Sequence, residues 1–115
     1  MAKKLRCTYE MEIDVEFENP EAAKAYFIDG EWKTVFYRLD DLQEVAEHLS
    51  LCFHNEHDRW DSEAKSFRRD IEGYGRYFKQ ADGTYKVDAA SAAEIGTMIT
   101  VAYESELDNA GTYEV

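Results

Sequence analysis

The segment CTYEMEIDVEFE, from Cys7 to Glu18, decides the fold. Its odd positions carry apolar or amphipathic side chains, whereas its even positions are polar. This alternation predicts a β-strand, because successive side chains of a strand point to opposite faces of a sheet. One face of the strand is expected to pack on a core. The other face carries five carboxylates and no cation: Glu10, Glu12, Asp14, Glu16 and Glu18.

Periodicity and boundary residues organise the rest of the chain. Asn19 and Pro20 predict the start of a short helix, and Asp40 predicts the cap of a long one. Trp60 is expected to pack at the entry of a second helical segment. The predicted elements are helices over 20–28, 41–57, 62–72 and 89–95, strands over 31–39 and 97–106, and a hairpin over 74–87.

Together these elements predict an α+β fold, in which an antiparallel sheet of about four strands has helices packed on one face. The length of 115 residues predicts a single domain over 1–115. An aromatic fraction of 14% argues that this acidic chain folds, because disordered acidic chains are poor in aromatic residues. The ends, 1–6 and 108–115, are expected to be loose.

The net charge of −12 is larger than the magnitude of about 2–8 that serves ordinary solubility. Such a charge argues against direct binding to nucleic acid or to an anionic membrane, and it favours the basic surface of another protein as the partner. If strands from the two ends of the chain are neighbours, acids near the C-terminus extend the acidic face. The predicted partner-binding residues are therefore Glu10, Glu12, Asp14, Glu16, Glu18, Glu104 and Glu106.

Two interpretations of this acidic face remain open. Carboxylates on alternate strand positions lie roughly 6.6–6.8 Å apart, which is about twice the phosphate spacing along one DNA strand. The face could therefore imitate part of a nucleic-acid backbone to a basic cleft. Alternatively, it is the solvated side of a half-exposed sheet, where acids prevent aggregation.

The cysteines and the hydropathy predict a cytoplasmic protein. Cys7 and Cys52 are the only cysteines, and in a chain without a recognisable leader they are best interpreted as reduced, buried thiols. No apolar run is long enough for a membrane-spanning helix, so no membrane is expected as a partner.

No metal, cofactor or catalytic site is expected. His48 and Cys52 share one helix face, but His54 and His57 lie on another, whereas a zinc site needs four convergent ligands. A metal held by His48, Cys52 and a distant carboxylate is the weak alternative. No nucleophile, phosphate-loop or calcium-loop motif is present, and carboxylates are too abundant for any pair to be diagnostic. The protein is therefore interpreted as non-catalytic.

The range 65–86 supplies a different functional hypothesis. It contains six of the cations, interleaved with aromatic residues, which is the composition of single-stranded nucleic-acid binders. Aromatic residues of a hairpin are, however, more often core or cross-strand pairs. A third alternative is an oligomeric structural protein, such as a homodimer, whose sheet face or edge pairs with a second copy.

In its size, its acidity and the stretch from Glu12 to Phe17, the chain resembles small proteins encoded by phages and prophages. That class includes inhibitors of host defence, among them anti-restriction and anti-CRISPR proteins. The resemblance implies a non-catalytic inhibitor that binds a nucleic-acid-handling host protein, such as a defence nuclease. It carries over no functional residue, because it rests on no diagnostic motif.

Overall fold

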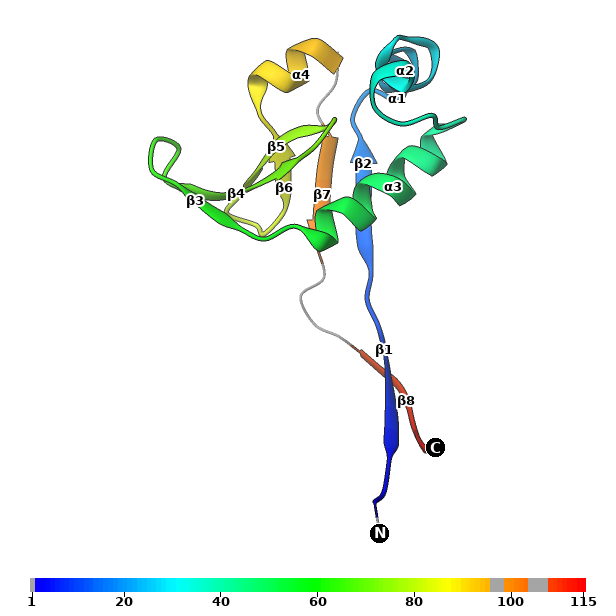
Figure 1. Ribbon diagram of the computed structural model, residues 1–115. Coiled ribbons are helices and arrows are strands. Elements are labelled where there is room, and N and C mark those ends of the chain that lie inside the picture. Colours follow the sequence, from blue (N-terminus) through cyan, green and yellow to red (C-terminus); the bar gives the residue numbers. More distant parts are fainter. Residues whose placement is uncertain (1, 96–98, 104–107) are drawn as a thin grey trace.

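The computed structural model describes residues 2–95, 99–103 and 108–115 (Figure 1). It confirms the α+β fold, with antiparallel strands and helices. The strands are β1 Leu5–Glu10, β2 Ile13–Phe17, β3 Arg59–Asp61, β4 Ser66–Ile71, β5 Gly75–Lys79, β6 Tyr85–Val87, β7 Ile99–Tyr103 and β8 Asp108–Glu114. The helices are α1 Pro20–Lys24, the π-helix η1 Ala25–Asp29, α2 Trp32–Val35, α3 Leu42–Asn55 and α4 Ala89–Ile95.

Six strands form one sheet in the order β2-β7-β6-β5-β4-β3, and every neighbouring pair is antiparallel. Strands from the two ends of the chain are neighbours in this sheet, because β2 pairs with β7. Figure 1 shows β2 continuing into β1, which leaves the body of the molecule and pairs with β8 in a separate two-stranded ribbon. The predicted hairpin over 74–87 is present as β5 and β6.

The strand predicted over Cys7 to Glu18 is wrong in its continuity and its extent. Residues 11–12 separate β1 from β2, so the alternating segment is divided between the ribbon and the main sheet. The ends predicted to be loose are also partly ordered: β1 begins at Leu5, and β8 runs over Asp108–Glu114. The two end segments pair with each other as β1 and β8. Because they are far apart in the sequence, no local sequence pattern could predict this pairing.

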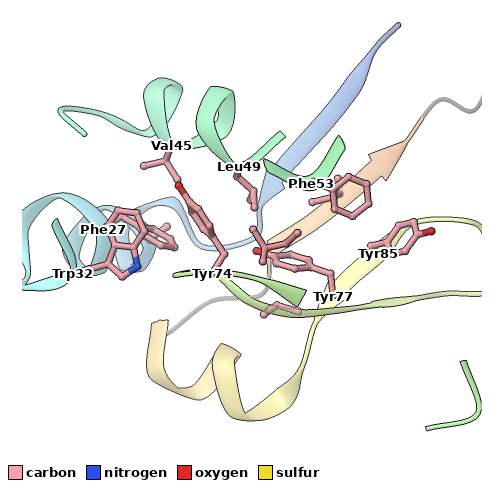
Figure 2. Packing of buried hydrophobic residues seen from close by; sticks show 12 residues of the cluster. Phe27, Trp32, Val45, Leu49, Phe53, Tyr74, Tyr77 and Tyr85 are labelled. Carbon is pink, nitrogen blue, oxygen red and sulfur yellow. The ribbon is translucent and has the colours of Figure 1, made fainter. Parts of the chain in front are cut away.

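The core lies between α3 and the sheet. Figure 2 shows Val45, Leu49 and Phe53 pointing from α3 toward the aromatic side chains of the sheet and of the segment before α3. Phe27 and Trp32 meet edge-to-face at 4.9 Å, and Phe53 and Tyr85 meet at 4.8 Å at the other end of the core. Full burial of such side chains contributes roughly 1.5–3 kcal/mol each, before conformational entropy is subtracted.

Side-chain caps set the starts of α1 and α3, and Asp88 caps α4 by accepting from the Ser91 N–H at 3.1 Å. The side chain of Asn19 accepts a hydrogen bond from the Ala22 N–H, as its position before Pro20 predicts. For α3 the cap is Asp41, not Asp40: Asp41 accepts from the Glu44 N–H at 2.9 Å. Glu44 in turn accepts from the Asp40 N–H at 2.6 Å, so its carboxylate reaches the residue before the cap and not the cap itself, as a capping box would require.

Two predicted elements have the wrong type. The helix predicted over 62–72 is a hairpin, because the Asp61 side chain accepts from the N–H groups of Glu63 and Ala64 and closes a turn between β3 and β4. The strand predicted over 31–39 contains the helix α2 instead. The Trp32 indole of α2 donates to the carbonyl of Gly73 at 2.6 Å, so a tertiary contact overrides the β-propensity of this aromatic segment.

Candidate functional site

The acidic face consists of Glu10, Glu12, Asp14, Glu16 and Glu18, and all five residues are exposed. The intervening Met11, Ile13, Val15 and Phe17 are half-buried, so the alternation between a core side and a solvent side persists from Met11 to Phe17. This burial pattern agrees with the predicted solvent side for Glu12, Asp14 and Glu16, whereas Glu10 belongs to β1, in which every residue is exposed.

Strand pairing leaves the centre of the acidic face without a neighbouring cation. In the register with β7, Asp14 lies opposite Ala102 and Glu16 opposite Thr100. The next residue along the row is Lys86 of β6, two strands away from Glu16. Strands are about 4.7–4.9 Å apart, so this separation approaches the screening length of about 8–10 Å. None of the ion pairs among the described residues involves Asp14 or Glu16.

The acidic face is divided between two parts of the molecule. Glu10 belongs to the ribbon, Asp14 and Glu16 belong to β2, and Glu12 lies between them. A uniform spacing therefore applies only along β2, which is an edge strand of the main sheet. Glu104 and Glu106 lie outside the described residues.

The exposed edge gives the acidic face a further property. Within the described chain β2 has only β7 as a strand neighbour, so one side of its backbone lacks a strand partner. Charged side chains on an edge strand discourage pairing with other sheets. The carboxylates of β2 therefore disfavour pairing of this edge with another sheet.

The cysteines occupy unlike environments. Cys52 is half-buried on α3, whereas Cys7 is exposed in the ribbon, so the expectation that both thiols are buried is wrong for Cys7. Cys7 lies on the apolar side of the alternating pattern, but every residue of β1 is exposed, so no part of the described chain covers that side.

The His48–Cys52 pair lies in a network of ring contacts. The Tyr74 hydroxyl lies 2.8 Å from Nδ1 of His48, and Sγ of Cys52 lies 3.7 Å from Nε2 of the same ring. Burial lowers the pKa of His48, while burial and then the Glu56 carboxylate raise the pKa of Cys52, which disfavours the thiolate. In the described part of the chain no three His, Cys, Asp or Glu side chains gather as metal ligands.

The cations of the range 65–86 are partly engaged within the protein. Arg69 binds the Asp58 carboxylate at 2.8 Å and donates to the carbonyl of Phe53. Arg68 forms ion pairs with Asp61 and Asp70. The aromatic residues interleaved with these cations are Tyr74, Tyr77, Phe78 and Tyr85. The three tyrosines are buried in the core, and Phe78 is half-buried.

Sequence reasoning missed an exposed aromatic pair outside the core. Trp60 and Phe67 face each other across β3 and β4, with ring centroids 5.2 Å apart and exposed fractions of 58% and 44%. The register of β4 with β5 places Lys79 next in this row. The helix predicted over 62–72 concealed the pair, because only strand pairing brings positions 60 and 67 together.

A shallow apolar groove lies where the ribbon meets the body. It is lined by Met11, Ile13, Glu47, Ser50, Leu51 and His54. Leu51 is 61% exposed although it is large and apolar. Helical periodicity does not single out this residue, since it lies on the side of α3 that turns away from the core.

No helix in the described ranges is both long and apolar enough to cross a membrane. No family model matches the chain, and the searches of curated proteins and of solved structures also found no match.

Proposed function

We propose that the protein is a non-catalytic binding module whose acidic face engages a basic site on another protein, by imitating nucleic acid to a protein that handles it. The observation that carries the proposal is the exposed stretch of β2 on which Asp14 and Glu16 have no cation on the neighbouring strand. Fixed carboxylates on a sheet require little reorganisation when a basic surface approaches, and complementary charge accelerates the encounter.

The position of β2 at the edge of the sheet supports the same function. A basic groove that accepts one nucleic-acid strand also accepts a narrow, acidic edge more readily than a broad acidic surface. The net charge of −12 adds a long-range attraction to such a groove. The resemblance to phage-encoded proteins suggests a host protein such as a defence nuclease as the class of partner.

The proposal predicts salt-sensitive capture of a basic protein. In a pull-down from nuclease-treated lysate, the partner should elute at moderate salt, because exposed charges are screened over about 8–10 Å at 0.1–0.15 M. The double variant Asp14→Lys/Glu16→Lys should weaken association at least about tenfold, since it opposes like charges. Both side chains are exposed, so the fold should be retained.

The matched control is Glu63→Lys/Glu72→Lys, which makes the same change in net charge at two exposed positions away from β2. Binding that falls equally in both variants would reflect net charge alone. Undiminished binding of Asp14→Lys/Glu16→Lys would refute the acidic face as the site.

The exposed Trp60–Phe67 pair favours a second candidate, which is binding of single-stranded nucleic acid by stacking. Lys79 in the same row would contact phosphate. Retention that disappears on nuclease treatment in the same pull-down would favour this surface over the acidic face.

A further inference from the structure

We propose that the ribbon is a self-association element, in which β1 pairs antiparallel with β1 of a second copy about a twofold axis at Thr8. The resulting four-stranded sheet would have the order β8-β1-β1-β8. This inference goes beyond the proposed function and does not depend on the acidic face binding another protein.

The ribbon lacks the packing that a two-stranded sheet needs. All six residues of β1 are exposed, and β8 is its only strand neighbour among the described residues. Figure 1 shows the ribbon projecting from the body, away from the helices. Isolated two-stranded sheets are at best marginally stable in water, whereas additional strands and an apolar face stabilise them. A further strand on β1 would supply both.

The backbone geometry shows which edge of β1 is available. The carbonyl of Lys4 accepts a hydrogen bond from the Val115 N–H at 3.1 Å, so the even-numbered residues up to Thr8, where the register with β8 shifts, direct their backbone groups toward β8. By alternation, Leu5, Cys7 and Tyr9 direct their N–H and C=O groups to the opposite edge. That edge can therefore hydrogen-bond to another strand without disturbing β8.

The charges of this segment are complementary to themselves when it is reversed about Thr8. Arg6 of one copy then lies opposite Glu10 of the other, and Lys4 lies opposite Glu12, each pair occurring twice by symmetry. Opposite charges that face each other directly across two antiparallel strands stabilise the pairing. Centring on Tyr9 also gives two charge pairs per copy, but these use Glu12 and Asp14, beyond the end of β1. The axis at Thr8 keeps the Arg6–Glu10 pair within β1.

The same register, with the axis at Thr8, also places apolar side chains opposite apolar side chains. Leu5 of one copy lies opposite Met11 of the other, and Cys7 lies opposite Tyr9. Leu5 and Tyr9 are 55% and 54% exposed in the single chain, so their pairing would bury apolar surface. Met11 also lines the groove beside Leu51, which would place Leu5 of the second copy at that groove. A change of register by one residue, with the axis between Thr8 and Tyr9, would oppose Cys7 with Glu10 and Arg6 with Met11, that is, apolar with charged side chains.

Cross-linking tests the twofold axis. In a Cys7→Ser background, Thr8→Cys should form a disulfide-linked dimer on mild oxidation. The Thr8 pair is of the non-hydrogen-bonded type, with Cα atoms about 4.5 Å apart, which suits a disulfide. The matched control is Thr112→Cys, an exposed position on β8, which should remain monomeric on a denaturing gel. The proposal would be overturned if Tyr9→Cys formed the cross-linked dimer and Thr8→Cys did not. It would also be overturned if no cysteine variant of β1 formed a cross-linked dimer.

Charge exchange tests the same register without cysteine chemistry. Light scattering over a concentration series should show a monomer–dimer equilibrium for the intact chain. Arg6→Glu should raise the dimer Kd about tenfold or more, because two ion pairs become like-charge contacts. Arg6→Glu/Glu10→Arg should restore it, and unchanged circular dichroism would confirm that each variant is folded. A monomer at every concentration, or no recovery in the double variant, would overturn the proposal.

Discussion

Tyr85 connects three elements through one buried hydroxyl. Its hydroxyl donates to the Asp58 carboxylate at 2.9 Å, and Arg69 binds the same carboxylate while its guanidinium lies 4.4 Å from the centre of the Phe53 ring. Burial, followed by the hydrogen bond to Asp58, raises the pKa of Tyr85 to about 12 from an ordinary value of 10.0. The same contacts lower the pKa of Asp58: desolvation opposes this shift, but the bonds from Arg69 and Tyr85 prevail.

This arrangement predicts a loss of stability at alkaline pH. In the unfolded chain tyrosine loses its proton near pH 10, whereas Tyr85 in the folded protein keeps it until about pH 12. The folded state therefore binds more protons than the unfolded state in this interval, and the free energy of unfolding must fall as pH rises from 10 to 12. Denaturant unfolding at pH 8, 10 and 11 measures this slope.

The control for this effect is the variant Tyr85→Phe, whose tyrosine ionisation is followed by absorbance during an alkaline titration. Tyr85→Phe should remove one late-ionising group from the alkaline titration and reduce the slope of stability against pH. Stability that stays constant between pH 10 and 11 would contradict the assigned burial of this hydroxyl.

At the scale of an element, the start of helix α3 depends on which of two adjacent residues is the N-cap. Its apolar positions follow the helical period, so the sequence predicts its location well. The sequence does not distinguish the two adjacent aspartates before it as the cap. In the structure the backbone of Asp41 is extended, and its carboxylate reaches the N–H group of Glu44.

Substitution of the two aspartates separates these alternatives. Asp41→Ala should lower the free energy of unfolding by about 0.5–2 kcal/mol, since it removes the cap. Asp40→Ala should cost less, because Asp40 contributes its backbone N–H, which alanine retains. Thermal or urea denaturation of the two variants gives the comparison, and a larger loss for Asp40→Ala would place the cap where the sequence alone suggested it.

The accuracy of the sequence predictions follows from the range of the interactions that form each element. The solvent side of β2 and the core side of α3 follow from periods of 2 and 3.6, so Asp14, Glu16 and Leu49 were placed correctly. The Asp61 turn and the Trp32–Gly73 bond involve contacts that no periodicity encodes, and there the element type was wrong. The same reason explains why the exposed Trp60–Phe67 pair was missed.

At the scale of the whole molecule, the ribbon extends the particle. The radius of gyration of the protein is 17.1 Å and its longest dimension is 59 Å. A compact domain of about a hundred residues has a radius of gyration near 13 Å. The body contains the core cluster, while β1 is exposed throughout. Stability is therefore expected to be distributed unevenly between the body and the ribbon.

Hydrogen exchange should reveal this division. In dilute solution the amides of β1 and β8 should exchange much faster than those of α3 and β5, because few buried contacts oppose local opening of the ribbon. Mass spectrometry of peptic peptides resolves these segments. Equal protection of ribbon and core in dilute solution would contradict an isolated ribbon.

The pairing of β1 with β8 and of β2 with β7 also affects how the chain acquires its structure. During synthesis β1 and β2 emerge first, and their partner strands emerge only after the helices and the β3–β6 strands. Such long sequence separations slow folding, and unpaired strands expose nascent chains to aggregation. The carboxylates at alternate positions of β2 repel other nascent chains while β2 is still unpaired. The acids of β2 would therefore act as an intrinsic solubility tag until β7 is synthesised and pairs with β2.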